Sequence, residues 1–216
     1  MAPLDLCHTV TVPEDCSEIL SRYSLKILNL NIRSIHKNFD SFIVILKRLC
    51  LDFDVMVFSE CWLGESVTIP QLPGYISFQS KKYINMSSGV ALYIKNQWTA
   101  NFSEISVEEG NCILGEVAGH FSVVAAYIPP SFTNPENFIR SLDHNLKAVS
   151  PRPCLVLAGD LNINIIGSAG DSGCSSEYLD IMADYDLVPG INKPTCGKSC
   201  IDHIFVPARR IVESAV

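Results

Sequence analysis

The stretch Cys154-Leu-Val-Leu-Ala-Gly-Asp-Leu-Asn162 contains an apolar run, a glycine, and then a carboxylate and a carboxamide two residues apart. An apolar run of this length predicts a buried strand, and the polar residues mark its exposed end. In an extended chain residues i and i+2 point the same way, so Asp160 and Asn162 are predicted to converge on one spot. Gly159 leaves room for a ligand or backbone to come close. A strand followed by an Asp/Asn turn has the same pattern, so the stretch alone leaves both interpretations open.

The residues before this stretch predict a βαβ unit. Residues 25–32 have the composition of a buried strand, and the apolar residues between Phe39 and Cys50 recur at helical spacing. Residues 54–59 form the next predicted strand. A strand, a helix and a strand in this order indicate two parallel strands of one sheet.

Short strands dominate the rest of the chain. Gly, Pro or Asn residues separate β-rich runs at 74–78, 88–94, 112–118 and 121–128. Gly119-His120 is typical of a tight hairpin turn, and the Thr-x-x-Glu pattern of 133–136 predicts a helix to about Lys147. A strand over 154–159, a shorter helix over 176–185 and a last strand over 200–206 follow. Strands joined by both hairpins and crossovers predict an α/β fold with two sheets face to face and helices outside.

Length and composition predict one domain in a reducing, intracellular compartment. The 216 residues are 48% hydrophobic, enough for a single core over 24–216, while 1–23 show no clear period and are predicted to be a poorly ordered lead-in. No apolar run of about 18 residues and no signal-peptide pattern occur, so no membrane contact is expected. The nine cysteines are odd in number and lie mostly in apolar runs, as free buried thiols do.

The net charge of −7 restricts the kind of nucleic-acid contact that is expected. Binding of phosphates over a broad surface depends on clusters of Lys and Arg, which this chain lacks. Any contact with nucleic acid is therefore predicted to be local. The sequence does not indicate an oligomeric state.

Polar side chains recur at the ends of the predicted strands, where loops at one end of a rigid sheet commonly build a site. They are Asn31, Glu60, Tyr127, Asp160 and Asp202. Each alone is also typical of a cap, a turn or a core aromatic residue. Their recurrence is what indicates a functional site.

Six motifs, taken in order, resemble the endonuclease/exonuclease/phosphatase superfamily, and most closely the apurinic-type endonuclease domain of LINE (non-LTR) retrotransposons. The motifs are Asn31-Ile-Arg-Ser34, Ser59-Glu-Cys-Trp-Leu63, Ser88-Gly-Val-Ala-Leu-Tyr93, Ala126-Tyr-Ile-Pro-Pro130, Gly159-Asp-Leu-Asn162 and Ser199-Cys-Ile-Asp-His-Ile204. The resemblance covers about residues 25–207. It implies a four-layer α/β sandwich that nicks DNA by hydrolysing a phosphodiester bond with Mg²⁺, or with Mn²⁺ in its place.

The resemblance assigns a metal and a water-activating group to this chain. Glu60 resembles the metal-binding glutamate, and Asn31 resembles the asparagine that supports the metal and the phosphate. A hard, small cation suits such oxygen ligands and keeps several waters. Asp160 resembles the residue that activates or orients the attacking water.

The phosphate contacts follow from the same resemblance. Asn162 resembles the partner of Asp160 on the phosphate, and Tyr127 would donate a hydrogen bond to it. Thr195 and Ser199 match polar positions that line the same pocket.

Two departures from the family pattern affect the predicted activity. Asp202 corresponds to an acid that orients a histidine from a later Ser-Asp-His motif, and these residues stop at Val216 before one. His203 is a poor substitute, because adjacent strand residues face opposite sides of a sheet, and it is interpreted as structural. The resemblance thus implies a C-terminally truncated nuclease of reduced activity. Arg33 stands where apurinic repair enzymes carry an acid, which favours the retrotransposon branch, whose action on chromosomal DNA would be nuclear.

Three alternatives stay open. Zinc could bind Cys196, Cys200 and His203 with Cys174, although Cys200 and His203 are an odd number of residues apart on a predicted strand. Another phosphoesterase of the superfamily, acting on phosphoinositides, sphingomyelin or nucleotides, would have nearly the same site and would suit the acidic charge. A non-catalytic binding module would keep the fold without the reaction.

Overall fold

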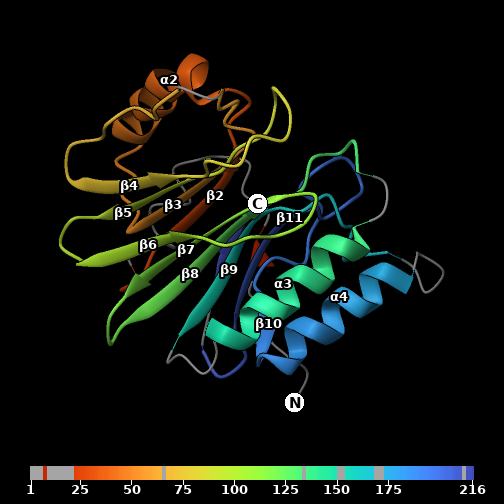
Figure 1. Ribbon diagram of the computed structural model, residues 1–216. Helices are drawn as coiled ribbons and strands as arrows, with labels where there is room; N and C mark the ends of the chain where they lie inside the picture. Colours follow the sequence, from red (N-terminus) through yellow and green to blue (C-terminus); the bar gives the residue numbers. More distant parts are fainter. Residues whose placement is uncertain are drawn as a thin grey trace.

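Two mixed β-sheets pack face to face, and helices lie on their outer faces (Figure 1). The structure is a computed structural model that describes residues 7–8, 22–64, 67–132, 135–149, 154–167, 173–210 and 213–216. The element bounds below refer to this part of the chain.

The smaller sheet has four strands in the order β2-β3-β5-β4. They are β2 (Ile27–Asn31), β3 (Val55–Ser59), β4 (Tyr75–Gln79) and β5 (Ala91–Lys95). β2 and β3 are parallel and helix α2 (Ile35–Arg48) connects them, which confirms the predicted βαβ unit. The helix begins at Ile35 rather than at the predicted Phe39, because Ile35 lies one turn earlier and is fully buried as well.

The larger sheet has six strands in the order β10-β11-β9-β8-β7-β6. They are β6 (Ala100–Glu104), β7 (Asn111–Val117), β8 (Phe121–Tyr127), β9 (Leu155–Asp160), β10 (Leu187–Pro189) and β11 (Asp202–Pro207). Helices α3 (Glu136–Val149) and α4 (Gly173–Asp184) cover its outer face (Figure 1). β8 and β9 are parallel, and all other neighbours are antiparallel. The predicted turn at Gly119-His120 joins β7 to β8.

Some elements differ from the prediction or lie outside the described residues. The sequence pattern does not predict β6 and β10, because β6 is a half-exposed edge strand and β10 has only three residues. A short parallel pair, β1 (Cys7–His8) and β12 (Ser214–Ala215), was also not predicted. Most of residues 1–23, and Thr133 of the capping pattern, are outside the described residues, so those expectations stay predictions.

Three apolar layers hold the four structural layers together and confirm the predicted four-layer α/β sandwich. The layer between α2 and the smaller sheet contains Phe39, Phe58 and Tyr93, whose rings contact one another. The layer between the larger sheet and its helices contains Phe138 and Tyr178. The third layer lies between the two sheets and contains the inner-facing residues of both.

Residues in the layer between the sheets change from apolar to polar along each strand. On β9, Val156 and Ala158 belong to this layer, and Asp160 follows them at the same two-residue spacing. On β8, Phe121, Val123 and Ala125 precede Tyr127 in the same way. The polar residues at the strand ends therefore face the space between the two sheets.

Gly159 allows β8 and β9 to approach each other closely. A Cβ atom at this position would lie 1.7 Å from the carbonyl oxygen of Ala126 on β8. The glycine is thus required by the neighbouring backbone, which is one of the two roles that the sequence predicts for it.

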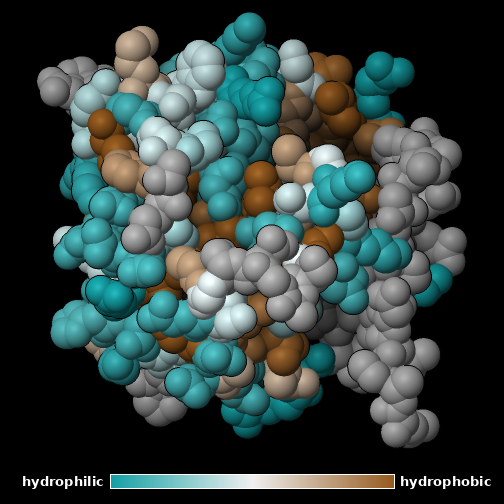
Figure 2. Space-filling view, turned by 90° about the vertical axis from the view of Figure 1, so that its right-hand side faces the viewer, coloured by the Kyte–Doolittle hydropathy of each residue, from teal (hydrophilic) through white to brown (hydrophobic). Residues whose placement is uncertain are grey.

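Surface and thiol chemistry agree with the composition. Hydrophilic residues cover much of the face seen in Figure 2, with hydrophobic residues visible in patches between them. The cysteines in the described part of the chain whose side chains are placed are free thiols, as predicted, but only Cys61, Cys112 and Cys200 are buried, whereas Cys50 and Cys196 are exposed. No helix in this part of the chain is long and apolar enough to cross a membrane.

Candidate active site

Three polar side chains form a row across the larger sheet. Tyr127 is the register partner of Asp160 in the β8–β9 pair, and Asp160 is the partner of Asp202 in the β9–β11 pair. Register partners of neighbouring strands point to the same face of a sheet. The sheet therefore brings together three residues that are separated by 33 and 42 positions in the sequence.

The smaller sheet contributes Asn31 and Glu60 to the same place. The Asn31 side-chain amide nitrogen donates to Glu60 Oε1 at 2.7 Å and to Asp160 Oδ2 at 2.8 Å. Because both acceptors are carboxylates, the amide nitrogen must be the atom that faces them. One carboxamide thus joins a carboxylate that follows β3 to a carboxylate on β9, across the layer between the sheets.

The backbone around Glu60 is held in an uncommon conformation. Glu60 has a φ of 49°, and Arg33 and Ser34 also have positive φ values of 46° and 78°. The amide of Ser34 donates to the carbonyl oxygen of Glu60 at 2.8 Å. Left-handed non-glycine residues are uncommon and concentrate at functional sites, so these loops have the character of a site.

Burial and crowding of carboxylates raise the pKa of Asp160. This side chain is 2% exposed, and its pKa rises from the ordinary 3.8 to about 7. Burial is the largest cause, and the charge of Asp202 and then that of Glu60 add to it, while the hydrogen bond from Asn31 opposes the rise. The carboxyl group of Asp160 therefore changes its charge near neutral pH.

The neighbours of Asp160 respond in the same direction. Burial, followed by the charge of Glu60, raises the pKa of Asp202, although a hydrogen bond with Thr195 opposes the shift. Burial, followed by the charges of Glu60 and Asp160, raises the pKa of the Tyr127 hydroxyl. These shared charges show that the side chains belong to one electrostatic cluster.

Three buried polar atoms at this end of the sandwich have no hydrogen-bond partner of ordinary geometry among the described residues. They are Asn31 Oδ1, Ser59 Oγ and the Tyr127 hydroxyl, although Ser87 lies close enough to the last to lower its pKa slightly. An unsatisfied buried polar atom is unusual and calls for a ligand, an ion or a water. The site therefore contains both unpartnered oxygens and excess negative charge.

These residues fit a hard divalent cation that would be bound partly by the protein and partly by a phosphate group of the substrate. Within the described ranges, no group of three or more His, Cys, Asp or Glu side chains is arranged to hold a metal ion by itself. Glu60 and the free Oδ1 of Asn31 offer oxygen ligands, and Mg²⁺ usually takes few protein ligands together with waters and phosphate oxygens. The donor set thus suits Mg²⁺ bound together with a phosphate.

Asn162 lies next to Asp160 but not by the expected geometry. β9 ends at Asp160, and Asn162 has a φ of 51°, so the chain is not extended between them. The Asn162 backbone amide donates to Asp160 Oδ1 at 3.3 Å, and its side-chain amide donates to the Ile128 carbonyl at 2.8 Å. The Asp/Asn turn and the site are therefore the same feature, and both interpretations of this stretch apply.

Thr195 and Ser199 lie in the segment that leads into β11. The Thr195 hydroxyl oxygen accepts hydrogen bonds from the backbone amides of Ile201 and Asp202, each at 3.1 Å. Ser199 forms backbone hydrogen bonds with Thr195 and Cys196. Thr195 thus positions the backbone at Asp202, and Ser199 closes the turn that carries Thr195.

His203 is a structural residue, as predicted from its position beside Asp202. It is fully buried, and burial lowers its pKa from 6.5 to about 4. Its Nε2 lies 3.0 Å from the Ile163 carbonyl and 3.2 Å from the Cys200 carbonyl, so this nitrogen carries the proton and Nδ1 accepts from the Tyr178 hydroxyl at 3.3 Å. Both ring nitrogens are occupied, which contradicts the zinc alternative.

Two residues that hold the site together were missed by the sequence reasoning. Asn111 is the register partner of Tyr127; it accepts from the Gly89 amide at 3.2 Å and donates to the Lys82 carbonyl at 2.7 Å. Asn29 donates to the Gly159 carbonyl at 3.1 Å, two residues before Asn31 on the same strand. An asparagine next to a turn or inside a strand has no distinctive sequence signal, because its partners lie far away in the chain.

The family model described as "Endonuclease/Exonuclease/phosphatase family" matches residues 28–216. The chain belongs to this family. The match contains β3, β8, β9, β11 and all of β2 except Ile27, so every predicted site residue lies within the matched residues. No curated protein matches the sequence.

Solved structures share the fold of this endonuclease/exonuclease/phosphatase domain at low sequence identity. The endonuclease domain of TRAS1, a telomere-specific non-LTR retrotransposon, has 14% identity and a TM-score of 0.61, with 85% of each chain covered. The 3′-5′ exonuclease NExo from Neisseria meningitidis has 16% identity and a TM-score of 0.63, with 85% of this chain and 87% of that chain covered. An AP endonuclease from Leishmania major has 14% identity and a TM-score of 0.66, with 88% and 82% covered. These similarities establish the fold.

Proposed function

We propose that this chain is a Mg²⁺-dependent endonuclease that nicks DNA. The observation that carries the proposal is the Asn31 amide, which donates to carboxylates of two different sheets. With Asp202 beside them, these groups concentrate negative charge in a buried place, and a divalent cation would relieve it. The family match supports hydrolysis of a phosphate ester as the reaction class.

Glu60 and Oδ1 of Asn31 are the proposed holders of Mg²⁺, or of Mn²⁺ in its place. When bound, the ion supplies neutralisation of charge on the phosphate oxygens and on the leaving group. The unpartnered state of Asn31 Oδ1 supports this assignment. It also explains why the opposite side of the same carboxamide is fixed by two carboxylates.

Asp160 is the proposed acceptor of a proton from the attacking water. A general base works best when its pKa lies near the operating pH, and the pKa of about 7 meets this condition. The Tyr127 hydroxyl, which is buried and points into the same cluster, donates to a phosphate oxygen. Asn162 fixes the Asp160 carboxylate through its backbone amide.

Asp202 is proposed to orient a histidine, as the resemblance to the family implies. Among the described histidines none forms a hydrogen bond with Asp202, and His203 is committed to other partners. A missing acid–base group lowers a rate by about 10²- to 10⁴-fold. If Asp202 orients such a histidine, joining a Ser-Asp-His segment to these residues raises the nicking rate by at least about 10²-fold; an unchanged rate contradicts this role of Asp202.

DNA of a retrotransposon target is the proposed substrate. Arg33 replaces the acid of apurinic repair enzymes, and the fold is similar to the TRAS1 endonuclease domain. The net charge of −7 supports a contact confined to the nicked phosphate and its neighbours. Action on chromosomal DNA would place the protein in the nucleus.

Nicking of supercoiled plasmid tests the proposal directly. Wild-type protein is expected to nick with Mg²⁺ and not with EDTA, and Glu60→Ala and Asp160→Ala are expected to lose at least about 10²-fold in rate. Asp180→Ala removes an exposed carboxylate of α4 and is the matched control with an unchanged rate. Full activity of Glu60→Ala, or nicking in EDTA, would overturn the proposal.

A second candidate is another phosphoesterase of the same superfamily. The acidic net charge favours a small phosphate ester over a polyanion. Release of phosphate or of a headgroup from nucleotides, inositol phosphates or sphingomyelin vesicles, lost in Glu60→Ala, would support this candidate. Binding of DNA without any turnover, unaffected by Glu60→Ala, would instead indicate a binding module.

A further inference from the structure

Trp62 is an exposed tryptophan two residues after the proposed metal ligand Glu60. It is 46% exposed, whereas its neighbours Cys61 and Leu63 are buried in the apolar layer between α2 and the smaller sheet. Glu60 and Trp62 both have positive φ values, of 49° and 56°. The chain therefore holds an indole outside the core in a backbone conformation that is uncommon for a bulky residue and concentrates at functional sites.

Hydrogen bonds place the segment of Trp62 beside the carboxylate cluster. On one side, the amide of Ser34 donates to the carbonyl oxygen of Glu60 at 2.8 Å. On the other side, the amide of Leu63 donates to the carbonyl oxygen of Ser88 at 3.1 Å. Trp62 thus lies between the start of α2 and the loop that joins β4 to β5.

The loop between β4 and β5 brings further apolar side chains to this edge of the site. Tyr83 and Met86 of this loop are 48% and 81% exposed. Ser87 of the same loop lies next to the Tyr127 hydroxyl, which is the proposed donor to the phosphate. Trp62 and this loop therefore border the proposed positions of both the metal and the phosphate.

Positive charge is scarce along the same edge. Arg33 and Lys37 at the start of α2, and Lys81 and Lys82 in the loop, are the exposed cations of the two segments that flank Trp62. Affinity for duplex DNA comes largely from contacts of Lys and Arg with phosphates. Four separate cations in a chain of net charge −7 give only a weak and salt-sensitive contact of that kind. Most of the affinity for DNA has to come from another interaction.

Stacking provides such an interaction without charge. An aromatic ring that stacks on a nucleic-acid base strengthens binding by about 5- to 150-fold. In a duplex both faces of a base are covered by its neighbours, so a ring can stack only on a base that is unpaired or turned out of the helix. An exposed indole beside the carboxylates therefore suits DNA with unpaired bases.

We infer that Trp62 stacks on an unpaired base of the DNA strand that is cut, next to the scissile phosphate. Stacking of this kind rests on the proposed nuclease function and defines its substrate class as DNA that is single-stranded or locally melted at the nick. Tyr83 and Met86 continue the apolar surface along the same strand, and Arg33 contacts a neighbouring phosphate. Fully paired DNA leaves the indole without a partner and is bound more weakly.

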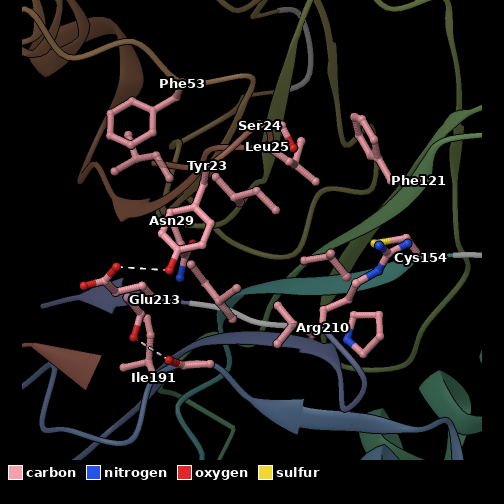
Figure 3. A pocket seen from close by; sticks show the side chains of 18 of the residues that line it. Tyr23, Ser24, Leu25, Asn29, Phe53, Phe121, Cys154, Ile191, Arg210 and Glu213 are labelled. Carbon is pink, nitrogen blue, oxygen red and sulfur yellow. Dashed lines mark hydrogen bonds between the residues drawn. The ribbon is translucent and has the colours of Figure 1, made fainter. Parts of the chain in front are cut away.

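Tryptophan fluorescence tests the inference by binding alone. The chain contains two tryptophans, and the other, Trp98, lines a pocket in the layer between the sheets, next to Phe121 (Figure 3). In a Trp98→Phe background the tryptophan emission comes from Trp62 alone. A single-stranded dodecamer, added with Ca²⁺ in place of Mg²⁺, is expected to quench this emission and to bind at least about tenfold more tightly than the duplex of the same sequence.

Matched substitutions at Trp62 separate stacking from a general apolar contact, with binding measured by the anisotropy of fluorescein-labelled DNA. Trp62→Phe keeps a ring and is expected to bind the single strand within about threefold of wild type. Trp62→Leu keeps apolar bulk without a ring and is expected to lose at least about fivefold in affinity for the single strand, with unchanged affinity for the duplex.

Two further variants serve as comparisons. Arg33→Ala removes a charge and is expected to weaken binding of the single strand and of the duplex by a similar factor. Val188→Ala removes an exposed apolar side chain of β10 and is expected to change neither. Circular dichroism and thermal melting confirm that all variants are folded.

Nicking with Mg²⁺ then separates this inference from the proposed function. A duplex with a short internal bubble is expected to be nicked in the bubble at least about tenfold faster than the fully paired duplex, and Trp62→Leu is expected to remove the difference. Equal nicking of both duplexes would retain the nuclease function and overturn the inference. Quenching and a preference for the single strand without any nicking would support the stacking and overturn the nuclease function.

Three results of the binding experiments would also overturn the inference. They are equal affinity for single-stranded and duplex DNA, binding of the single strand without a change in Trp62 emission, and equal losses in Trp62→Phe and Trp62→Leu. No binding of either form of DNA up to about 1 mM protein would overturn both the inference and the proposed function.

Discussion

The layer between the two sheets has opposite chemistry at its two ends: carboxylates and carboxamides lie at the candidate active site, and mostly apolar residues line a pocket at the other end. On three strands the inner-facing residues change type within four positions, from Ile27 to Asn31, from Val156 to Asp160, and from Val206 to Asp202. The backbone does not change, since both parts belong to the same strands. The distance between the two chemistries is about 13 Å, given the rise of a strand.

The site lies where polar side chains occupy inward-facing positions that are apolar elsewhere on the same strands. The same burial that stabilises valine penalises the charged form of aspartate, which is why the pKa of Asp160 is raised. Asn31 and Asn29 differ in the same way, because one donates to carboxylates and the other to backbone carbonyls. Changes on either side of the boundary can therefore separate function from stability.

The largest effect is expected at Gly159, where the two chemistries meet. Gly159→Ala places a Cβ atom 1.7 Å from the Ala126 carbonyl oxygen, so the parallel β8–β9 pair must separate, and unfolding becomes easier by more than about 4 kcal/mol. Urea denaturation measures this change. Gly173→Ala, at the start of α4 with nothing within 4 Å, is the control and is expected to change stability by less than about 1 kcal/mol. A loss of less than 1 kcal/mol at Gly159 would contradict the close strand contact.

The pH dependence of stability distinguishes the carboxylate cluster from the core beside it. Asp160 binds its proton more tightly in the folded state, so its contribution is present at pH 4 and is lost as the pH rises to about 7. His203, with a pKa of about 4, has the opposite sign, and its contribution is lost as the pH falls from 6.5 to 4. Between pH 4 and 6.5 in metal-free buffer, the changes in stability with pH that come from Asp160 and from His203 largely cancel.

Two single variants separate the contributions of Asp160 and His203 to the pH dependence of stability. Asp160→Asn is expected to gain stability with rising pH by roughly 3 kcal/mol over this range, and His203→Gln to lose roughly 3 kcal/mol. Thermal denaturation in EDTA at pH 4, 5, 6 and 7 measures both. Parallel curves for the two variants would show that the pKa values of these buried groups are not shifted in opposite directions.

A smaller effect is expected when either asparagine of β2 is replaced by alanine. Asn31→Ala removes the shared donor of two carboxylates and is expected to reduce nicking by at least about 10²-fold and stability by about 1–3 kcal/mol. Asn29→Ala removes donors to neutral carbonyls and is expected to reduce stability by a similar amount, with nicking changed by less than about fivefold. Equal losses of nicking would mean that the boundary between the two parts lies elsewhere.

The smallest effect is expected at Ser59, whose buried hydroxyl has no partner among the described residues. Ser59→Ala removes this hydroxyl and is expected to change stability by less than about 1 kcal/mol and nicking by less than about threefold. Tyr127→Phe removes the other unpartnered hydroxyl and is expected to reduce nicking by about 10-fold or more. A larger loss of nicking in Ser59→Ala than in Tyr127→Phe would show that Ser59, and not Tyr127, contacts the phosphate.

The parts of this fold that sequence reasoning could predict are those with a strong periodic pattern. β3, β8 and β9 are continuous apolar runs, and the polar residue at the end of each run identified Glu60, Tyr127 and Asp160. The register that brings Asp160 opposite Asp202 could not be predicted, because it depends on hydrogen bonds between strands 42 positions apart. The approach of these residues was expected only from their place at strand ends.

The remaining features depend on contacts that leave no local signal. The turn that redirects Asn162 is set by the Ile128 carbonyl, and the position of Asn111 is set by Gly89 and Lys82 on another loop. The edge strand β6 alternates too weakly in hydropathy to be recognised.

The Asn31 carboxamide has one more consequence, for how the molecule responds to mechanical and thermal disturbance. It is a rigid planar group whose two hydrogen bonds, 2.7 and 2.8 Å long, tie the end of one sheet to the other. An expansion of the sandwich by even a fraction of an ångström would lengthen these bonds before it disrupted any strand. The geometry of the carboxylate cluster would then be lost at a lower temperature than the fold, so the spacing of the two sheets would set the upper temperature limit of the proposed reaction.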